Sequence, residues 1–215
     1  MHSGGPCYSL PVMYALTDLE RRDDRPTEDH VVTLSDVSWE DYERMLEVRG
    51  DRSAPRMTYV EGVLEIMSPS KDHEKIKSLI GCLVEAYCLE RGVHFSPFGS
   101  WTLKNKAKKR GAEPDECYVL GTADADRPHL AIEVIWTSGR LDKVDIYSKL
   151  GVREVWYWRK GRIQPYGLRG EEYETLSKSE LLPDLDLDLL LSFLDRPTAY
   201  DAIRDYRDAL ARRSP

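Results

Sequence analysis

The pattern of apolar and polar residues predicts five helices, and in the longest of them apolar residues recur at helical spacing. In the longest, apolar side chains from Ile76 to Tyr87 share one face, and Gly92 follows the last periodic residue. Ser38 precedes the first predicted helix with Asp41 three residues later, a spacing typical of a helix start. The predicted helices cover residues 39–48, 141–150, 185–194 and 198–213, and the longest runs from Ser68-Pro69 or Ser70 to about residue 91.

Short runs rich in apolar and β-branched residues lie between these helices and predict strands. Two of them are joined tightly at Glu61-Gly62, which indicates a hairpin. Residues 131–135 are apolar apart from Glu133, a pattern that indicates a strand buried on both faces. The predicted strands cover residues 57–60, 63–67, 95–103, 112–120, 129–135, 152–158, 162–168 and 173–176.

The order of the central elements predicts the fold class. From residue 70 it runs helix, strand, strand, strand, helix, strand, which indicates an α/β protein with a mixed β-sheet flanked by helices. Residues 1–35 have no sustained periodicity and include an almost wholly charged stretch, so we expect a poorly ordered extension. The main domain is then expected over residues 36–195, with a C-terminal helix in residues 196–215.

Length and composition are those of a soluble globular domain. The chain has 215 residues, of which 41% are hydrophobic and 32% charged. No apolar run approaches the ~20 residues of a membrane span, and no signal peptide is evident, so we expect a cytoplasmic protein without a membrane partner. The four cysteines have no CxxC spacing and predict free thiols.

The net charge of −7 argues mildly against a general nucleic-acid coat but not against nucleic acid as a substrate. A local exception is a basic segment with five cationic residues in seven positions. Its phosphate-binding candidates are Lys104, Lys106, Lys108, Lys109 and Arg110. A solvated, flexible loop explains the segment equally well.

Two carboxylates carry the strongest chemical signal. Glu133 interrupts an apolar strand, where an ionised group is costly unless it is paired or bound to a metal. Asp115 follows Pro114 on the preceding predicted strand, and adjacent strands can bring the two acids together. Two facing anions repel unless a cation lies between them, and Mg²⁺ or Mn²⁺ suits oxygen ligands. The alternatives are a salt-bridged or exposed Glu133 and an ordinary Pro-Asp turn.

Three further polar residues could join this acid pair. Lys143 begins the helix after the Glu133 strand and can reach back over the sheet, although a solvated surface lysine is the alternative. Glu74 could add an outer carboxylate, and His73 could contact a phosphate or act as a base. Both also suit the first turn of a helix as plain polar residues.

This combination resembles the Uma-two family, restriction-endonuclease-like proteins within the PD-(D/E)XK nuclease superfamily. The resemblance extends over about residues 55–194. The matching positions are residues 59–69 (YVEGVLEIMSP), His73, Glu113-Pro114-Asp115, residues 131–135, Asp142-Lys143, Tyr147, residues 151–156 and residues 182–185.

The resemblance implies a restriction-endonuclease-like core with elements in the order α-β-β-β-α-β. It also implies a Mg²⁺-dependent phosphodiesterase in which Asp115 and Glu133 bind the metal. The sequence departs from the superfamily pattern at Ile135, which occupies the position of the usual lysine. Lys143 would serve instead, delivered from the following helix.

The predicted function is therefore a metal-dependent endonuclease that hydrolyses DNA phosphodiester bonds. Its catalytic residues would be Asp115, Glu133, Lys143 and Glu74. A catalytically silent binding or assembly module of the same fold is the alternative, favoured by Ile135 and by the net acidity. A phosphoesterase acting on small molecules, or a nucleotide-processing enzyme, with the same metal site is a third and weaker reading. The aromatic strand at residues 155–158 would supply core or, less favoured, the surface of a homodimer.

Overall fold

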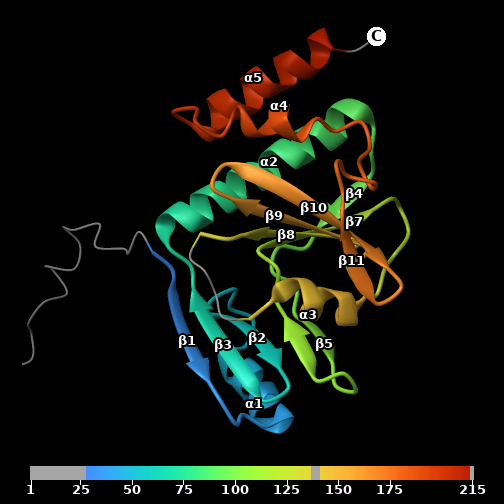
Figure 1. The fold of residues 1–215 in the computed structure, drawn as a ribbon. Helices are drawn as coiled ribbons and strands as arrows, with labels where there is room; N and C mark the ends of the chain where they lie inside the picture. The colour runs from blue at the N-terminus through green and yellow to red at the C-terminus, as the bar shows by residue number, and fades with distance from the viewer. Residues whose placement is uncertain (1–27, 137–140, 214–215) are drawn as a thin grey trace, which may run out of the picture.

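The computed structural model describes residues 28–136 and 141–213, and these residues form two β-sheets with five helices (Figure 1). One sheet has the order β1-β3-β2-β6-β5 and is antiparallel throughout. Its strands are β1 His30–Leu34, β2 Arg56–Val60, β3 Val63–Ser68, β5 Leu103–Asn105 and β6 Arg110–Ala112.

The other sheet has the order β11-β10-β9-β8-β7-β4 and is mixed, because β8 and β9 run parallel while the other pairs are antiparallel. Its strands are β4 Phe95–Pro97, β7 Glu116–Leu120, β8 Leu130–Val134, β9 Glu154–Arg159, β10 Arg162–Arg169 and β11 Glu172–Thr175. The predicted α/β class with a mixed sheet and flanking helices is confirmed, with the strands divided between two sheets.

The helices pack on different faces of the sheets. They are α1 Trp39–Arg49, α2 Lys71–Arg91, α3 Lys143–Leu150, α4 Leu187–Leu191 and α5 Ala199–Arg212. Helix α2 lies across the six-stranded sheet, with α4 and α5 beside it, and α3 lies between the two sheets (Figure 1). Within the described residues, no helix is long and apolar enough to cross a membrane.

Strand β8 is buried on both faces, as its apolar run predicts. Leu130, Ile132 and Val134 belong to the core under α2, whereas Ala131 belongs to the core around α3. Side chains alternate across a strand, so Glu133 shares the face of Ala131 and points toward α3. The alternation of side chains along β8 thus places the Glu133 carboxylate on the side that faces α3.

Local capping chemistry sets the ends of the two helices that flank the acids. The Ser70 side chain accepts a hydrogen bond from the His73 amide at the start of α2, and Gly92 ends that helix in the left-handed region. Asp142 caps α3 in the same way, so this helix begins at Lys143 rather than at the predicted residue 141. Both predicted helices are confirmed, and Lys143 lies in the first turn.

Two predicted strands are wrong in their extent. Residues 95–103 and 112–120 each divide into strands of different sheets, β4 with β5 and β6 with β7. The chain passes from the first sheet to the second through Glu113-Pro114-Asp115, where proline has no amide hydrogen for a ladder. The sequence pattern does not reveal this crossing, because the strand residues on both sides of it, in β6 and β7, are mostly buried.

The expectation of a disordered extension through residue 35 is wrong for residues 30–34. They form β1, which pairs with β3 from His30 opposite Ser68 to Leu34 opposite Leu64. Just before β1, the Asp29 carboxylate accepts a hydrogen bond from the Ser70 amide. The domain therefore begins before the predicted residue 36, whereas residues 1–27 lie outside the described residues. The predicted helix at residues 185–194 shortens to α4, and α5 matches its prediction closely.

Glu113 holds the crossing between the sheets, and its loss tests that role. The fully buried carboxylate pairs with Arg49 at 2.6 Å and accepts hydrogen bonds from the Thr102 hydroxyl and the Met57 amide. We expect Glu113→Ala to lower the free energy of unfolding by about 3 kcal/mol, because it leaves the buried guanidinium of Arg49 without its carboxylate partner. Urea denaturation followed by circular dichroism measures the change.

The matched control is Glu43→Ala, which removes a partly exposed glutamate paired with the exposed Lys104. Exposed ion pairs contribute little, so this variant should unfold close to the wild-type midpoint. Equal midpoints for the Glu113 and Glu43 variants would contradict a structural role for Glu113.

Candidate active site

Asp115 lies at the junction of the two sheets and is fully buried. Arg56 of β2 donates to one carboxylate oxygen at 2.5 Å, and the Val134 amide of β8 donates to the other at 2.6 Å. The Nε2 atom of His73, on α2, lies 3.1 Å from that second oxygen. Burial alone would raise the pKa of Asp115, but Arg56 and His73 hold it well below its usual range. This carboxylate is ionised near neutral pH.

Glu133 is the second buried carboxylate and faces α3. It accepts hydrogen bonds from the Lys143 ammonium at 2.6 Å and from the Tyr147 hydroxyl. Burial raises the pKa of Glu133 and the nearby charge of Asp115 raises it further, while Lys143 opposes both effects. Because the Asp115 carboxylate binds the amide directly after Glu133, the structure brings Asp115, Glu133 and Lys143 into one cluster.

Glu74 joins the cluster indirectly, through Arg56. The Arg56 guanidinium donates to Glu74 at 2.8 Å while its other Nη atom binds Asp115. Glu74 is partly exposed and also pairs with Lys77 at 3.0 Å. It therefore orients the arginine that compensates Asp115, and sequence reasoning missed that arginine because buried arginines are rare and leave no periodic signal.

His73 bridges two carboxylates and is almost completely buried. Its Nδ1 atom lies 2.9 Å from Asp29 and its Nε2 atom 3.1 Å from Asp115. Ionised carboxylates only accept hydrogen bonds, so both ring nitrogens must carry protons. Burial lowers the pKa of His73, but the two carboxylates outweigh it and raise the pKa to about 9. A doubly protonated imidazole has no free lone pair and cannot act as a base.

The donor set is compatible with a single hard divalent cation. Asp115 and Glu133 offer carboxylate oxygens, and Mg²⁺ commonly uses one or two carboxylates with water and substrate oxygens filling the other positions. Within the described residues no group of three or more histidine, cysteine or acidic side chains gathers at metal-binding distance. A cation would therefore rest on the acid pair alone and would compete with Lys143 and Arg56 for its oxygens.

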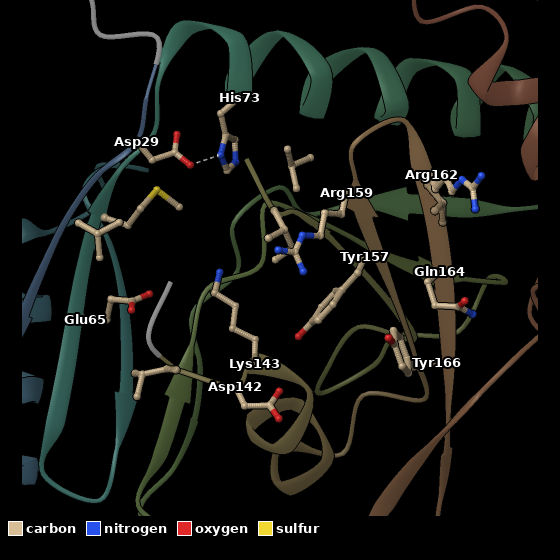
Figure 2. Close-up of a pocket in the computed structure, with 16 residues that line it drawn as sticks. Asp29, Glu65, His73, Asp142, Lys143, Tyr157, Arg159, Arg162, Gln164 and Tyr166 are labelled. Carbon is tan, nitrogen blue, oxygen red and sulfur yellow. Dashed lines mark hydrogen bonds and ion pairs between the residues drawn. The ribbon is translucent and has the colours of Figure 1, made fainter. Parts of the chain in front are cut away.

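A cavity of about 440 Å³, whose lining residues are drawn in Figure 2, lies close to the acid pair, although neither acid lines it. His73 and Lys143 form part of its wall, and each contacts one of the acids behind them. The side chains of Lys143, Tyr157 and Arg159 point into the cavity (Figure 2). Ile135 also lines it, so the position of the usual superfamily lysine contributes an apolar side chain.

The basic segment is largely neutralised by neighbouring acids and lies away from this cavity. Lys104 and Lys106 pair with glutamates of α1, Lys108 pairs with Glu171 near β11, and Arg110 pairs with acids at 3.0 and 3.3 Å. None of the five basic residues lines the cavity. The segment therefore ties together α1, α3 and the β10–β11 turn, and its predicted role in phosphate binding has no support from this geometry.

Two sheets flanked by helices, with a buried acid pair at their junction and a lysine supplied by the next helix, define a mixed α/β protein. The chain belongs to the Uma2 family, described as a putative restriction endonuclease, which matches residues 39–197. The predicted resemblance is thereby confirmed.

One solved structure similar to this chain is a putative nuclease belonging to DUF820 from Anabaena variabilis. Its sequence is 14% identical, the match covers 75% of this chain and 96% of that chain, and the TM-score is 0.42. No curated protein matches the chain.

His73 predicts a specific dependence of stability on pH. Its folded pKa of about 9 lies above the ordinary value of 6.5. The stabilisation from its protonated form is therefore complete below about pH 6.5 and is lost as the pH rises through about 9. We expect it to reach about 3 kcal/mol at its maximum. Urea denaturation of wild type and His73→Gln from pH 6 to 9.5, in chelator, measures the difference.

The difference between wild type and His73→Gln should shrink as the pH rises. His94→Gln, which changes an exposed histidine, is the control and should track wild type throughout. A difference that stays constant from pH 6 to 9.5 would mean that folding leaves the pKa of His73 unchanged, and a difference that grows with pH would mean that His73 is neutral in the folded protein.

Proposed function

We propose that this protein is a metal-dependent endonuclease that hydrolyses phosphodiester bonds in DNA. The observation that carries the proposal is the cluster formed by Asp115, Glu133 and Lys143, with the lysine ammonium 2.6 Å from Glu133 and at the wall of a cavity. Membership of a family described as a putative restriction endonuclease supports a nuclease, and such enzymes generally use divalent metals.

Asp115 and Glu133 would hold the cation, Mg²⁺ or Mn²⁺. When bound, such an ion supplies Lewis acidity toward a phosphoryl oxygen and toward water. Arg56, His73 and the Val134 amide hold Asp115 in one orientation, and Tyr147 does the same for Glu133. Preorganised ligands of this kind avoid reorganisation during the reaction.

Lys143 would act on the phosphate. Its ammonium stays protonated, because the charges of Glu133 and Asp115 raise its pKa more than burial lowers it. A cation at the cavity wall stabilises negative charge that develops on the phosphoryl oxygens. Lys143, in the first turn of α3, would thus supply the positive charge that Ile135 lacks. Glu74 would contribute by orienting Arg56.

A catalytically silent module of the same fold is the second candidate, and one observation favours it. Both buried acids already have compensating partners within the described residues: Arg56 and His73 for Asp115, and Lys143 for Glu133. The cluster is electrically satisfied without a metal. The free energy of metal binding must then offset the free energy lost when at least one of these ion pairs breaks.

Nuclease assays with Mg²⁺ or Mn²⁺, on plasmid and single-stranded DNA, separate the two candidates. We expect metal-dependent cleavage by wild type and losses of at least about 100-fold in Asp115→Asn and Lys143→Ala. Lys178→Ala, which changes an exposed lysine away from the cavity, is the matched control and should cleave normally. Circular dichroism verifies that each variant is folded.

Metal binding can be measured separately from cleavage, through the melting temperature. Mn²⁺ should raise the melting temperature of wild type but not of Asp115→Asn, because only a ligand of the folded state stabilises it. Cleavage that survives Asp115→Asn would indicate a contaminating nuclease. A folded wild type that neither cleaves nor responds to Mn²⁺ would establish the silent module instead.

A further inference from the structure

The cavity has one basic and aromatic wall, formed by β9 and β10. Tyr157 and Arg159 share the face of β9 that bears Val155, and Glu133 lies opposite Tyr157 in the parallel register of β8 and β9. The proposed metal ligand, a tyrosine and an arginine thus stand on one face of one sheet. Acidic side chains line other parts of the cavity, namely Asp29, Glu65 and Asp142.

Two arginines of this wall carry uncompensated charge. Arg159 and Arg162 are directly opposite each other in the β9–β10 register, and both are exposed. Among residues 28–136 and 141–213, neither has an acidic partner, in contrast to the paired cations of the basic segment. Like charges on facing positions destabilise a strand pair, so an anion between or beside them would be favourable.

Tyr157 adds an unsatisfied hydroxyl at the same wall. Its oxygen is buried and has no hydrogen-bond partner among the described residues. A buried polar group without a partner costs free energy that a ligand can recover. The hydroxyl points into the cavity together with the Arg159 side chain (Figure 2). Tyr166 stands beside it on β10, with ring centroids 5.5 Å apart and the rings edge to face.

The volume of the cavity limits the size of the ligand that it can bind. A volume of about 440 Å³ lies in the range of pockets that enclose one small ligand. One nucleotide can enter such a space only if its base is out of the stacked duplex, as in single strands or flipped nucleotides. Arginine for phosphate and aromatic rings for bases are the groups that single-strand sites use.

We propose that this cavity binds one nucleotide of a single-stranded polynucleotide, an inference that rests on the proposed nuclease function. Arg159 and the Tyr157 hydroxyl donate to the phosphate, and the ring of Tyr166 contacts the base. The phosphate that follows along the strand then reaches Lys143 and the acid pair. The enzyme would act on single strands, ends or unpaired segments rather than within an intact duplex.

Binding without cleavage tests this assignment. Fluorescence anisotropy of a labelled 12-nucleotide single strand, in EDTA, is compared with the same sequence as a blunt duplex. We expect the single strand to bind at least about tenfold more tightly. Arg159→Ala and Tyr166→Ala should each weaken its binding about tenfold, and Arg159→Ala should also lower the slope of log affinity against log salt.

Arg153→Ala is the matched control, because Arg153 is an exposed arginine just before β9 that does not line the cavity. It should bind as wild type does, and Tyr157→Phe should bind more weakly. Equal or tighter binding of the duplex, or unchanged single-strand binding by Arg159→Ala, would overturn the inference.

The outcome is separable from that of the proposed nuclease function. Single-strand binding that depends on Arg159 in a protein that never cleaves would uphold the cavity assignment and reject catalysis. Metal-dependent cleavage of duplex that is indifferent to Arg159→Ala would uphold catalysis and reject the cavity assignment.

Discussion

The buried carboxylate of Asp115 is the interaction on which the rest of the molecule depends. It accepts from Arg56 in the first sheet and from the Val134 amide in the second, and it contacts His73 on the long helix α2. A lone buried anion would be strongly destabilising, so three donors from three elements must be in place together. The same contacts that satisfy this charge therefore also set the relative position of the two sheets and α2.

The helices could be predicted from the sequence, because apolar periodicity and capping are local. Ser70 marks the start of α2 by the residue type that a cap needs, whereas the start of α3 after Asp142 and the bounds of α4 were missed by two or three residues. The division of the strands could not be predicted, because periodicity reports which side of a strand is buried and not which sheet it joins. The crossing at Glu113 is sustained by Arg49 of α1, a contact 64 residues away in sequence that no local pattern encodes.

The acid pair was predictable for a different reason. A glutamate inside an apolar strand is unusual enough to point to a site, and Glu133 led to Asp115 and Lys143 by strand and helix order alone. Two other partners of the acids, Arg56 and Tyr147, were not predictable, because they become neighbours of the acids only through the packing of the sheets and α3. The ion pairs of the basic segment were not predictable for the complementary reason: a charge run does not reveal the acids that fold against it.

Of the three cations at the acid pair, Lys143 is the one suited to move. The side chains of Arg56 and His73 are 4% and 1% exposed, whereas that of Lys143 is 14% exposed and ends at the cavity. A flexible four-carbon stem lets its ammonium leave Glu133 for a nearby anion at a smaller cost than a buried guanidinium or imidazolium would incur. A cation bound by Glu133 and a phosphate held by Arg159 would both favour that transfer. In the proposed function, the contact that neutralises Glu133 in the free protein would thus also be the contact through which the site engages a substrate.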